Sequence, residues 1–277
     1  MGKVLSQQQI NAYHEQGFIS PIDVMSEDEA TSYAHRLKAA EEKYPNELSG
    51  VNRNNGHLCF TFLDELAYHP KVLDAVEDIL GAHFSLWGSV LFIKEPNSSH
   101  FVSWHQDATY MGITPRHFVT PWIALTHSDR HTGCMSMIPK SHLNDIQPHK
   151  DTYGEDNILT RGQEVANVAV DQAVDLILKP GQMSLHHAMT IHGSQPNQSQ
   201  HQRRIGFALQ SFMPAGATQT IGQNNWPPAR GHCAQDGYHY LPRPQIDMAS
   251  ESVMTRDKCN QNFSDILYHG AKSKRDY

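Results

Sequence analysis

The sequence predicts a mainly β protein whose strands form a sandwich or a barrel, preceded by a short helical region. After Gly81 the hydrophobic period changes from helical to strand-like. The strand-like segments that follow are short and are separated by clusters of Gly, Pro, Asn and Ser. No helical pattern of about 10–15 residues lies between them, which argues against a parallel α/β sheet.

Three helices are predicted before the strands begin. The first covers residues 6–17, with its apolar side chains on one face. Ser26 and Glu29 have the spacing of a capping box, which predicts a longer helix that ends shortly before a Pro-Asn pair. The third helix is predicted over residues 71–80 and is followed by a glycine.

Strands are predicted where aromatic and β-branched residues gather, and the longest covers residues 83–94. The others are predicted at 101–105, 119–126, 134–138, 173–178, 183–187 and 204–212. Two polar stretches rich in turn residues, 144–164 and 214–244, are predicted to be long loops. Long loops inside a compact domain are often lids or binding loops.

The chain length bounds the domain count. A chain of 277 residues fits one large domain, because β barrels of this size commonly fold as a single unit. We expect one domain over residues 1–277, with a barrel core at about 83–212. The remaining segment, 213–277, is expected to be rich in loops and to contribute to the pocket.

Composition excludes several classes of partner. The 22 basic and 29 acidic residues give a net charge of −7, without a block of like charges, which argues against a nucleic-acid or polybasic membrane surface. No signal-peptide-like or transmembrane segment is present in the sequence. The four scattered cysteines argue against a disulfide framework and fit a reducing compartment. We therefore expect a cytoplasmic monomer or homodimer that acts on a small molecule.

Three His-x-Asp motifs occur where about one is expected by chance. They begin at His105, His127 and His149. A mononuclear Fe(II) site needs two imidazoles and one carboxylate on one octahedral face, and residues two apart share a face at a strand end. His149 lies in a polar loop and His127 in a turn, whereas His105 directly follows a predicted strand. The first motif is therefore the best placed.

A third ligand and a cation can be found downstream. His192 ends a predicted strand, and Arg203 and Arg204 begin the next one. An arginine on a strand can bind the distal carboxylate of a dicarboxylate co-substrate through two parallel hydrogen bonds. A strand presents only one of two neighbours inward, so either arginine could face the site. His186 and His187 are expected to be structural, since no carboxylate is seen to pair with them.

The chain resembles the phytanoyl-CoA dioxygenase family of Fe(II)- and 2-oxoglutarate-dependent oxygenases. The matching segments are SQQQINAYHEQGFI, WHQDATY, PWIALTHSDRHTGCMSMIPKSH and HGSQPNQSQHQRRIGFAL, in the order found in the family. They span most of the chain up to about residue 212. One departure is Lys140, where the family usually has glycine. The resemblance implies a double-stranded β-helix, a jelly-roll or cupin-like barrel, with N-terminal helices packed on one sheet.

The resemblance also implies residue roles. His105, Asp107 and His192 would hold the iron. Arg203, eleven residues after the distal histidine, would anchor 2-oxoglutarate, with Arg204 as the alternative. Family members contact the co-substrate at the positions of Gln106, Trp122 and Ser194.

The activity implied by the resemblance is hydroxylation of a C–H bond, with 2-oxoglutarate and O₂ as co-substrates and succinate and CO₂ as products. Halogenating relatives carry a small residue in place of Asp107, so the carboxylate favours a hydroxylase. We expect a small polar or zwitterionic substrate, such as an amino acid or an aminophosphonate. The alternative is a natural-product scaffold or an acyl-CoA ester.

Two other classes remain open. A zinc hydrolase would use the same kind of ligands but would give the anchoring arginine no role. A non-catalytic β-barrel binding module would not need an intact ligand triad. For Trp122 a purely core role, and for Ser194 a role in the tight turn, are alternatives to co-substrate contact.

Overall fold

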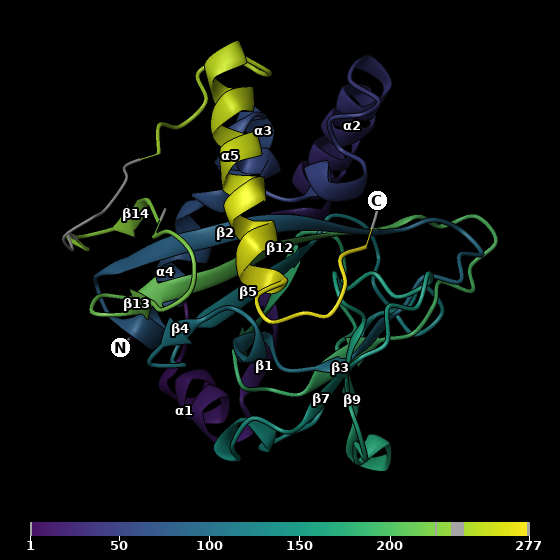
Figure 1. Ribbon diagram of the computed structural model, residues 1–277, viewed down its shortest axis with the longest axis vertical. Coiled ribbons are helices and arrows are strands. Elements are labelled where there is room, and N and C mark those ends of the chain that lie inside the picture. Colours follow the sequence, from purple (N-terminus) through teal and green to yellow (C-terminus); the bar gives the residue numbers. More distant parts are fainter. Residues whose placement is uncertain (1, 225, 234–240, 276–277) are drawn as a thin grey trace.

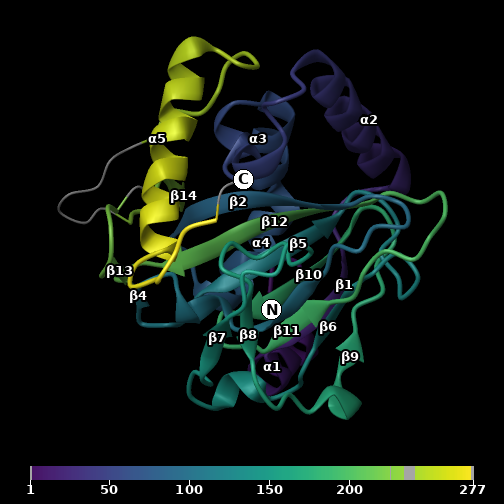
Figure 2. The same ribbon diagram turned by 45° about the vertical axis from the view of Figure 1, so that its right-hand side comes forward.

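The computed structural model describes residues 2–224, 226–233 and 241–275. A large antiparallel sheet has the strand order β1-β10-β5-β12-β2-β14, and a smaller one has the order β3-β11-β6-β9 (Figures 1 and 2). The strands of the large sheet are β1 (Phe18–Asp23), β2 (Phe84–Lys94), β5 (Val119–Ala124), β10 (Gln182–His187), β12 (Arg204–Pro214) and β14 (Pro228–Arg230). Those of the smaller sheet are β3 (Val102–His105), β6 (Met135–Met137), β9 (Val174–Asp175) and β11 (His192–Ser194). The predicted double-stranded β-helix is confirmed.

Two short ribbons complete the described strands. They pair β4 (Ile113–Thr114) with β13 (Thr218–Gln219), and β7 (His149–Asp151) with β8 (Gln163–Val165). All of the β7–β8 ribbon except Val165 lies in the stretch 144–164 that the sequence predicted to be a loop. The predicted loop 214–244 falls partly outside the described residues.

Five α-helices pack around the described strands. They are α1 (Gln7–Gln16), α2 (Glu27–Lys43), α3 (Thr61–Ala67), α4 (Pro70–Leu80) and α5 (Ser250–Leu267). Capping boxes at Ser6 and Ser26 begin the first two, as the sequence predicts for the second. The helix α1 packs on β1 and β10, and α4 packs on β5 and β12, which confirms the predicted placement of N-terminal helices on one sheet. No described helix is long and apolar enough to cross a membrane.

Strand alternation gives the large sheet two chemically different faces. On β12, Ile205, Phe207 and Leu209 belong to the main cluster of buried apolar side chains, together with residues of the helices. Burying such a side chain contributes about 1.5–3 kcal/mol. Because successive side chains point to opposite faces, Arg204 and Gln210 lie on the other face, toward the smaller sheet.

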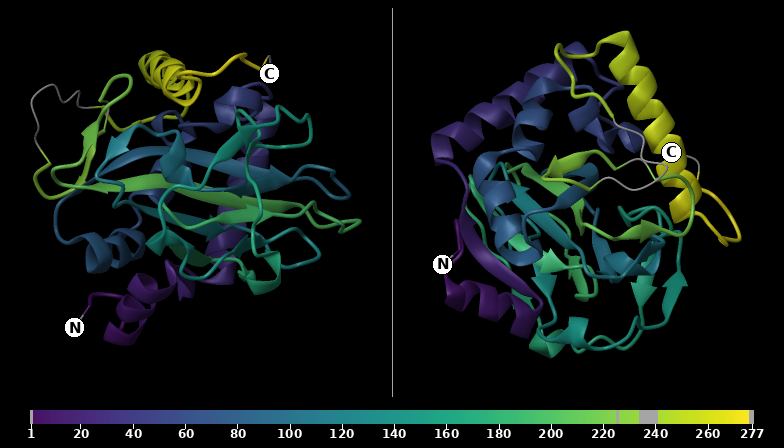
Figure 3. Two further views of the ribbon diagram at one scale, coloured as in Figure 1. Left: turned by 60° about the horizontal axis from the view of Figure 1, so that its bottom comes forward. Right: turned by 90° about the vertical axis from the view of Figure 1, so that its left-hand side faces the viewer.

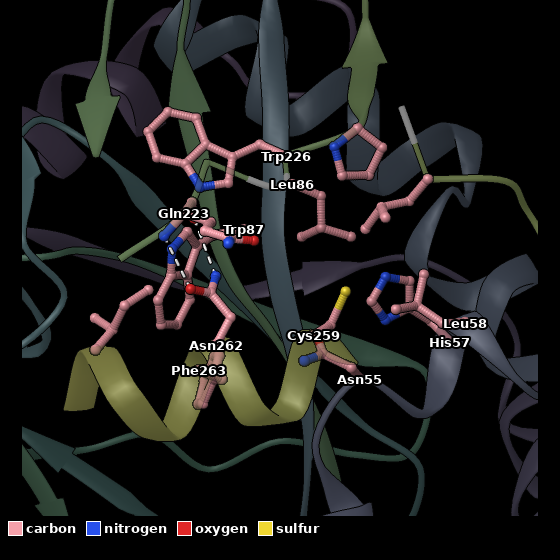
Figure 4. Close-up of a pocket in the computed structure, with 13 residues that line it drawn as sticks. Asn55, His57, Leu58, Leu86, Trp87, Gln223, Trp226, Cys259, Asn262 and Phe263 are labelled. Carbon is pink, nitrogen blue, oxygen red and sulfur yellow. Dashed lines mark hydrogen bonds between the residues drawn. The ribbon is translucent and has the colours of Figure 1, made fainter. Parts of the chain in front are cut away.

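The helix α5 lies beside β2, on the opposite side of the barrel from α1 (Figure 3). Figure 4 shows how it is held: the Phe263 ring lies 4.3 Å from the Trp87 ring of β2, and Asn262 exchanges hydrogen bonds with the backbone of Gln223. The segment 213–277, which the sequence predicted to be loop-rich, thus also contains an 18-residue helix that the sequence did not predict. Its buried positions, Arg256, Cys259, Phe263 and Ile266, follow a helical spacing that the polar composition obscured.

Candidate active site

The structure brings the three predicted metal ligands together. His105 ends β3 and His192 begins β11, and the two residues are paired directly across the smaller sheet. Asp107 follows two residues after His105 in a short 3₁₀ turn. Its Oδ1 lies 3.3 Å from Nε2 of His105 and 3.8 Å from Nε2 of His192. One ligand atom from each residue lies within 4.8 Å of the others, so a single ion could contact all three.

Backbone contacts orient both imidazoles. Nδ1 of His105 lies 2.9 Å from the Ser103 carbonyl, and Nδ1 of His192 lies 3.0 Å from the Thr190 carbonyl. A carbonyl accepts but cannot donate, so Nδ1 carries the proton and the Nε2 lone pair is free for a metal. Burial holds the pKa of His192 well below its usual value, which keeps this ring neutral.

The second carboxylate oxygen of Asp107, Oδ2, contacts two residues of the large sheet. Thr120 Oγ1 donates to Oδ2 over 3.2 Å, and His186 Nε2 lies 3.2 Å from the same oxygen. The expectation that no carboxylate pairs with His186 is therefore wrong. Burial alone would raise the pKa of Asp107, but His192, His105 and His186 together hold it well below its usual value. Two imidazoles and an ionised carboxylate are the donor set of non-haem Fe(II) oxygenases.

The other two His-x-Asp motifs do not join this cluster. His127 is exposed in a turn. His149 lies on β7, where its Nε2 accepts a hydrogen bond over 3.0 Å from the backbone N–H of Gln106. Burial lowers the pKa of His149 to about 4. This histidine therefore contacts the peptide between the first two ligands without facing the site as a ligand.

A narrow cavity runs from the triad between the two sheets to Arg204. This residue is 1% exposed, and its Nε and Nη2 have no hydrogen-bond partner in the part of the chain that the structure describes. The guanidinium carbon lies 5.2 Å from the Trp122 ring centre. Gly206 makes this arrangement possible, because a Cβ there would lie 1.8 Å from Trp122 Cζ2. An unpaired buried guanidinium is costly, so the cavity is shaped for an anion.

Lys94 is a second buried basic side chain at the same place, and it was not among the residues predicted from the sequence. It pairs in register with Arg204 across β2 and β12. Its Nζ donates to Ser194 Oγ over 2.7 Å and to the Gln195 carbonyl. Burial and the charge of Arg204 lower the pKa of Lys94 to about 6. Among the described residues, the partners of Lys94 Nζ are a hydroxyl and two carbonyls, and Arg204 Nε and Nη2 have none. The signal in the sequence was a lysine at the end of a strand that is otherwise uncharged.

Arg203 points away from the site. Its guanidinium binds Glu41 at 2.7 Å and Glu95 at 2.8 Å, and its side chain is 26% exposed. The expectation that Arg203 faces the co-substrate is therefore wrong, because strand alternation turns Arg204 inward instead.

The remaining predicted contacts divide into two groups. Trp122 and Ser194 line the narrow cavity. The Gln106 amide is used within the protein, since it donates to the Met189 carbonyl over 2.7 Å and accepts from the Gln147 N–H over 2.8 Å. It lies on the wall of a separate, outer cavity.

The outer cavity has a volume of about 690 Å³ and opens on the other side of the triad. The residues that line both cavities are Phe92, His105, Asp107, Leu159 and Gln210. Two of the predicted metal ligands, His105 and Asp107, thus lie at the junction between a small basic cavity and a large one, an arrangement that could bring two molecules together at one ion.

Two curated proteins that this chain resembles in sequence are dioxygenases by name. The chain is 30% identical over 174 residues to the "Probable alpha-ketoglutarate-dependent hypophosphite dioxygenase" of Stutzerimonas stutzeri, covering 62% of this chain and 60% of that protein. It is 30% identical over 136 residues to the peroxisomal phytanoyl-CoA dioxygenase of Bos taurus, covering 47% of this chain and 40% of that protein. The chain thus spans less than two thirds of the length of these relatives.

Solved structures share the fold over nearly the whole chain. The apo form of the non-heme monooxygenase ThoJ superposes with a TM-score of 0.83 and 26% identity, covering 94% of this chain and 98% of that one. CytC3 with Fe(II) and alpha-ketoglutarate superposes with a TM-score of 0.65 and 21% identity, covering 88% of this chain and 98% of that one, which shows the fold alone. The family model for phytanoyl-CoA dioxygenase (PhyH) matches residues 13–205, more than half of the chain. The protein belongs to the phytanoyl-CoA dioxygenase (PhyH) family.

Proposed function

We propose that this protein is an Fe(II)- and 2-oxoglutarate-dependent oxygenase that hydroxylates a C–H bond of an organic molecule. One observation carries the proposal: a His-Asp-His triad and a buried arginine with two unpaired N–H groups line the same narrow cavity. The names of the relatives, a probable alpha-ketoglutarate-dependent dioxygenase and a non-heme monooxygenase, support the same reading.

The side chains of the triad would hold the iron through Nε2 of His105, Nε2 of His192 and Oδ1 of Asp107. Iron and 2-oxoglutarate, when bound, supply the activation of O₂ that cleaves the C–H bond. Hydrogen bonds from Thr120 and His186 keep Oδ2 of Asp107 occupied and so fix the direction of Oδ1.

The co-substrate would lie between the triad and Arg204. The two unpaired N–H groups of Arg204 would bind the distal carboxylate, and Lys94 would add a second positive charge once the anion is present. Trp122 would form one wall of this cavity and Ser194 would hold Lys94 in place.

The cavity volume favours one of the two substrate classes that the sequence left open. Pockets of about 300–1,000 Å³ accommodate drug-sized ligands. A cavity of about 690 Å³ is far larger than hypophosphite or a small amino acid needs. We therefore favour a larger organic scaffold over a metabolite of a few atoms. Asp107 in the ligand set favours hydroxylation over halogenation.

A zinc hydrolase would explain the triad but not Arg204. That enzyme would carry a fully buried cation with unpaired donors and no function, at a cost in stability of several kcal/mol.

The experiment is an anaerobic titration of the protein with Fe(II) and then 2-oxoglutarate, followed by visible absorption. The oxygenase proposal expects a weak charge-transfer band that needs both additions, that is lost in Asp107→Ala and that survives in His127→Ala. If the wild-type protein gives no band with both additions, the proposal is wrong.

A further inference from the structure

The outer cavity carries chemical information about the substrate, and this inference rests on the proposed function. Its wall combines apolar and aromatic side chains, among them Phe92, Tyr153, Leu159 and Phe263, with a small number of polar groups. Such a wall recognises a mostly apolar molecule through a few directed polar contacts. The question is which polar groups are free to make them.

Most amide side chains on the cavity wall are already used within the protein. Asn157 bonds to Ser103, and Asn260 bonds to the backbone of Val51. Gln210 differs, because its Oε1 is buried without a hydrogen-bond partner. It also lines both cavities, together with two of the metal ligands. A substrate that lies beside the iron would therefore meet this amide first.

Two arginines on the same wall, Arg53 and Arg275, have no carboxylate within ion-pair distance among the described residues. Arg53 has a single long contact, from Nε to the Leu48 carbonyl over 3.4 Å, and its pKa is lowered by burial. The carboxylates on that side, Glu41 and Glu95, are both bound by Arg203.

Arg275 is held in place by protein carbonyls. Its guanidinium donates to the carbonyls of Asn157 and Gly154, from the loop on the far wall. Among the described residues, two acidic side chains line the cavity: Asp107 and Glu155. Glu155 is exposed. The charge that this wall presents to a ligand is therefore mainly positive.

We propose that the outer cavity binds an organic anion of drug-like size, with a carboxylate, sulfonate or phosphate held by Arg53 and Arg275. The body of the molecule packs on the aromatic wall, and a hydrogen-bond donor near the reacting carbon meets Gln210. A guanidinium binds an oxyanion through two parallel hydrogen bonds, which gives both affinity and orientation.

A matched pair of fluorescent probes tests this class directly. The dye 1-anilinonaphthalene-8-sulfonate carries a sulfonate, and N-phenyl-1-naphthylamine has the same rings without the charge. Both are titrated into protein that contains Fe(II) and saturating 2-oxoglutarate under anaerobic conditions, so that the narrow cavity is filled. We expect one site for the sulfonate and an affinity at least about tenfold above that for the neutral dye.

The variants locate the binding. Arg53→Gln and Arg275→Gln should each reduce the preference for the sulfonate severalfold, whereas Arg36→Gln, which removes an exposed arginine paired with Glu65, should leave it unchanged. Ser264→Trp, which adds bulk to the cavity wall on α5, should weaken both dyes equally. Thermal unfolding of each variant checks that it is folded.

Three results would overturn the inference: equal affinity for the two dyes, a preference that both arginine variants leave unchanged, or binding that Ser264→Trp does not affect. The dyes report binding and not turnover, so this outcome can be separated from failure of the proposed function. If the protein does not bind iron and 2-oxoglutarate, the titration is done without them. Arg204→Gln then shows whether the sulfonate has entered the narrow cavity instead.

Discussion

Replacing Arg204 and Arg203 one at a time tests which of the two arginines binds 2-oxoglutarate. Arg204 is 1% exposed and has two unpaired donors, whereas Arg203 is 26% exposed in its side chain and binds two glutamates. Removing one partner of a buried, hydrogen-bonded charge pair costs about 2–5 kcal/mol. At about 1.4 kcal/mol per tenfold, Arg204→Gln should raise the half-saturating 2-oxoglutarate concentration at least about 30-fold.

Although Arg204→Gln should weaken 2-oxoglutarate binding, it should not lower the stability of the protein without ligand. An unpaired buried cation destabilises the free protein, so Arg204→Gln should keep or raise the melting temperature without ligand. The same variant should lose the increase in melting temperature that 2-oxoglutarate gives to the metal-loaded wild-type protein. Arg203→Gln removes partly exposed ion pairs, each worth about 0–1 kcal/mol, and should bind 2-oxoglutarate normally.

The assay is thermal unfolding over a range of 2-oxoglutarate concentrations, with Fe(II) under anaerobic conditions. Arg204→Lys keeps the charge but not the two parallel donors, so it should bind with intermediate affinity. The reasoning is refuted if Arg203→Gln loses affinity while Arg204→Gln retains it.

Three further substitutions test other parts of the site and the fold. His186→Phe should weaken the binding of Co(II) about tenfold, because one contact to Asp107 Oδ2 is lost; visible absorption measures the binding. His187→Phe should leave Co(II) binding unchanged. An equal loss in both variants would argue against a role of His186 in holding Asp107. Gly206→Ala should lower the free energy of unfolding by about 1–3 kcal/mol, because the new Cβ displaces the Trp122 ring. The same displacement should weaken 2-oxoglutarate binding. An unchanged melting temperature would contradict the expected loss of stability. Burial lowers the pKa of His57 to about 3, so below pH 6.5 the unfolded state binds more protons than the folded state and stability falls. Measured by urea unfolding, the free energy of unfolding should be lower at pH 5 than at pH 7, with about 2 kcal/mol of the difference due to His57. His57→Gln should remove this part of the pH dependence. An unchanged pH dependence in that variant would refute the assignment of the effect to His57.

The convergence of His105, Asp107 and His192 could be predicted from the sequence, because the first two lie two residues apart after a predicted strand and the third lies at a strand end downstream. The choice between Arg203 and Arg204 was also within reach of the sequence. In the segment RIGFAL, the large apolar residues Ile205, Phe207 and Leu209 alternate with small ones, and that alternation places Arg204 on the face opposite the core. Counting residues from His192 gave the wrong neighbour because it ignored this pattern.

Other features depend on contacts between distant segments. His186 was set aside because no carboxylate lies near it in the sequence, yet Asp107 reaches it from the opposite sheet. Lys94 became recognisable only when strand pairing placed it against Arg204. The helix α5 has a polar composition and no side-chain cap, so its burial against β2, through Phe263, is a tertiary effect.

The proposed oxygenase would oxidise 2-oxoglutarate with O₂ at the site formed by His105, Asp107 and His192. The most direct measurement is mass spectrometry of succinate formed under ¹⁸O₂ with Fe(II), with or without added substrate. We expect succinate with one ¹⁸O atom from the wild-type protein and none from Asp107→Ala. Succinate without the label, or labelled succinate from Asp107→Ala at the wild-type rate, would contradict it.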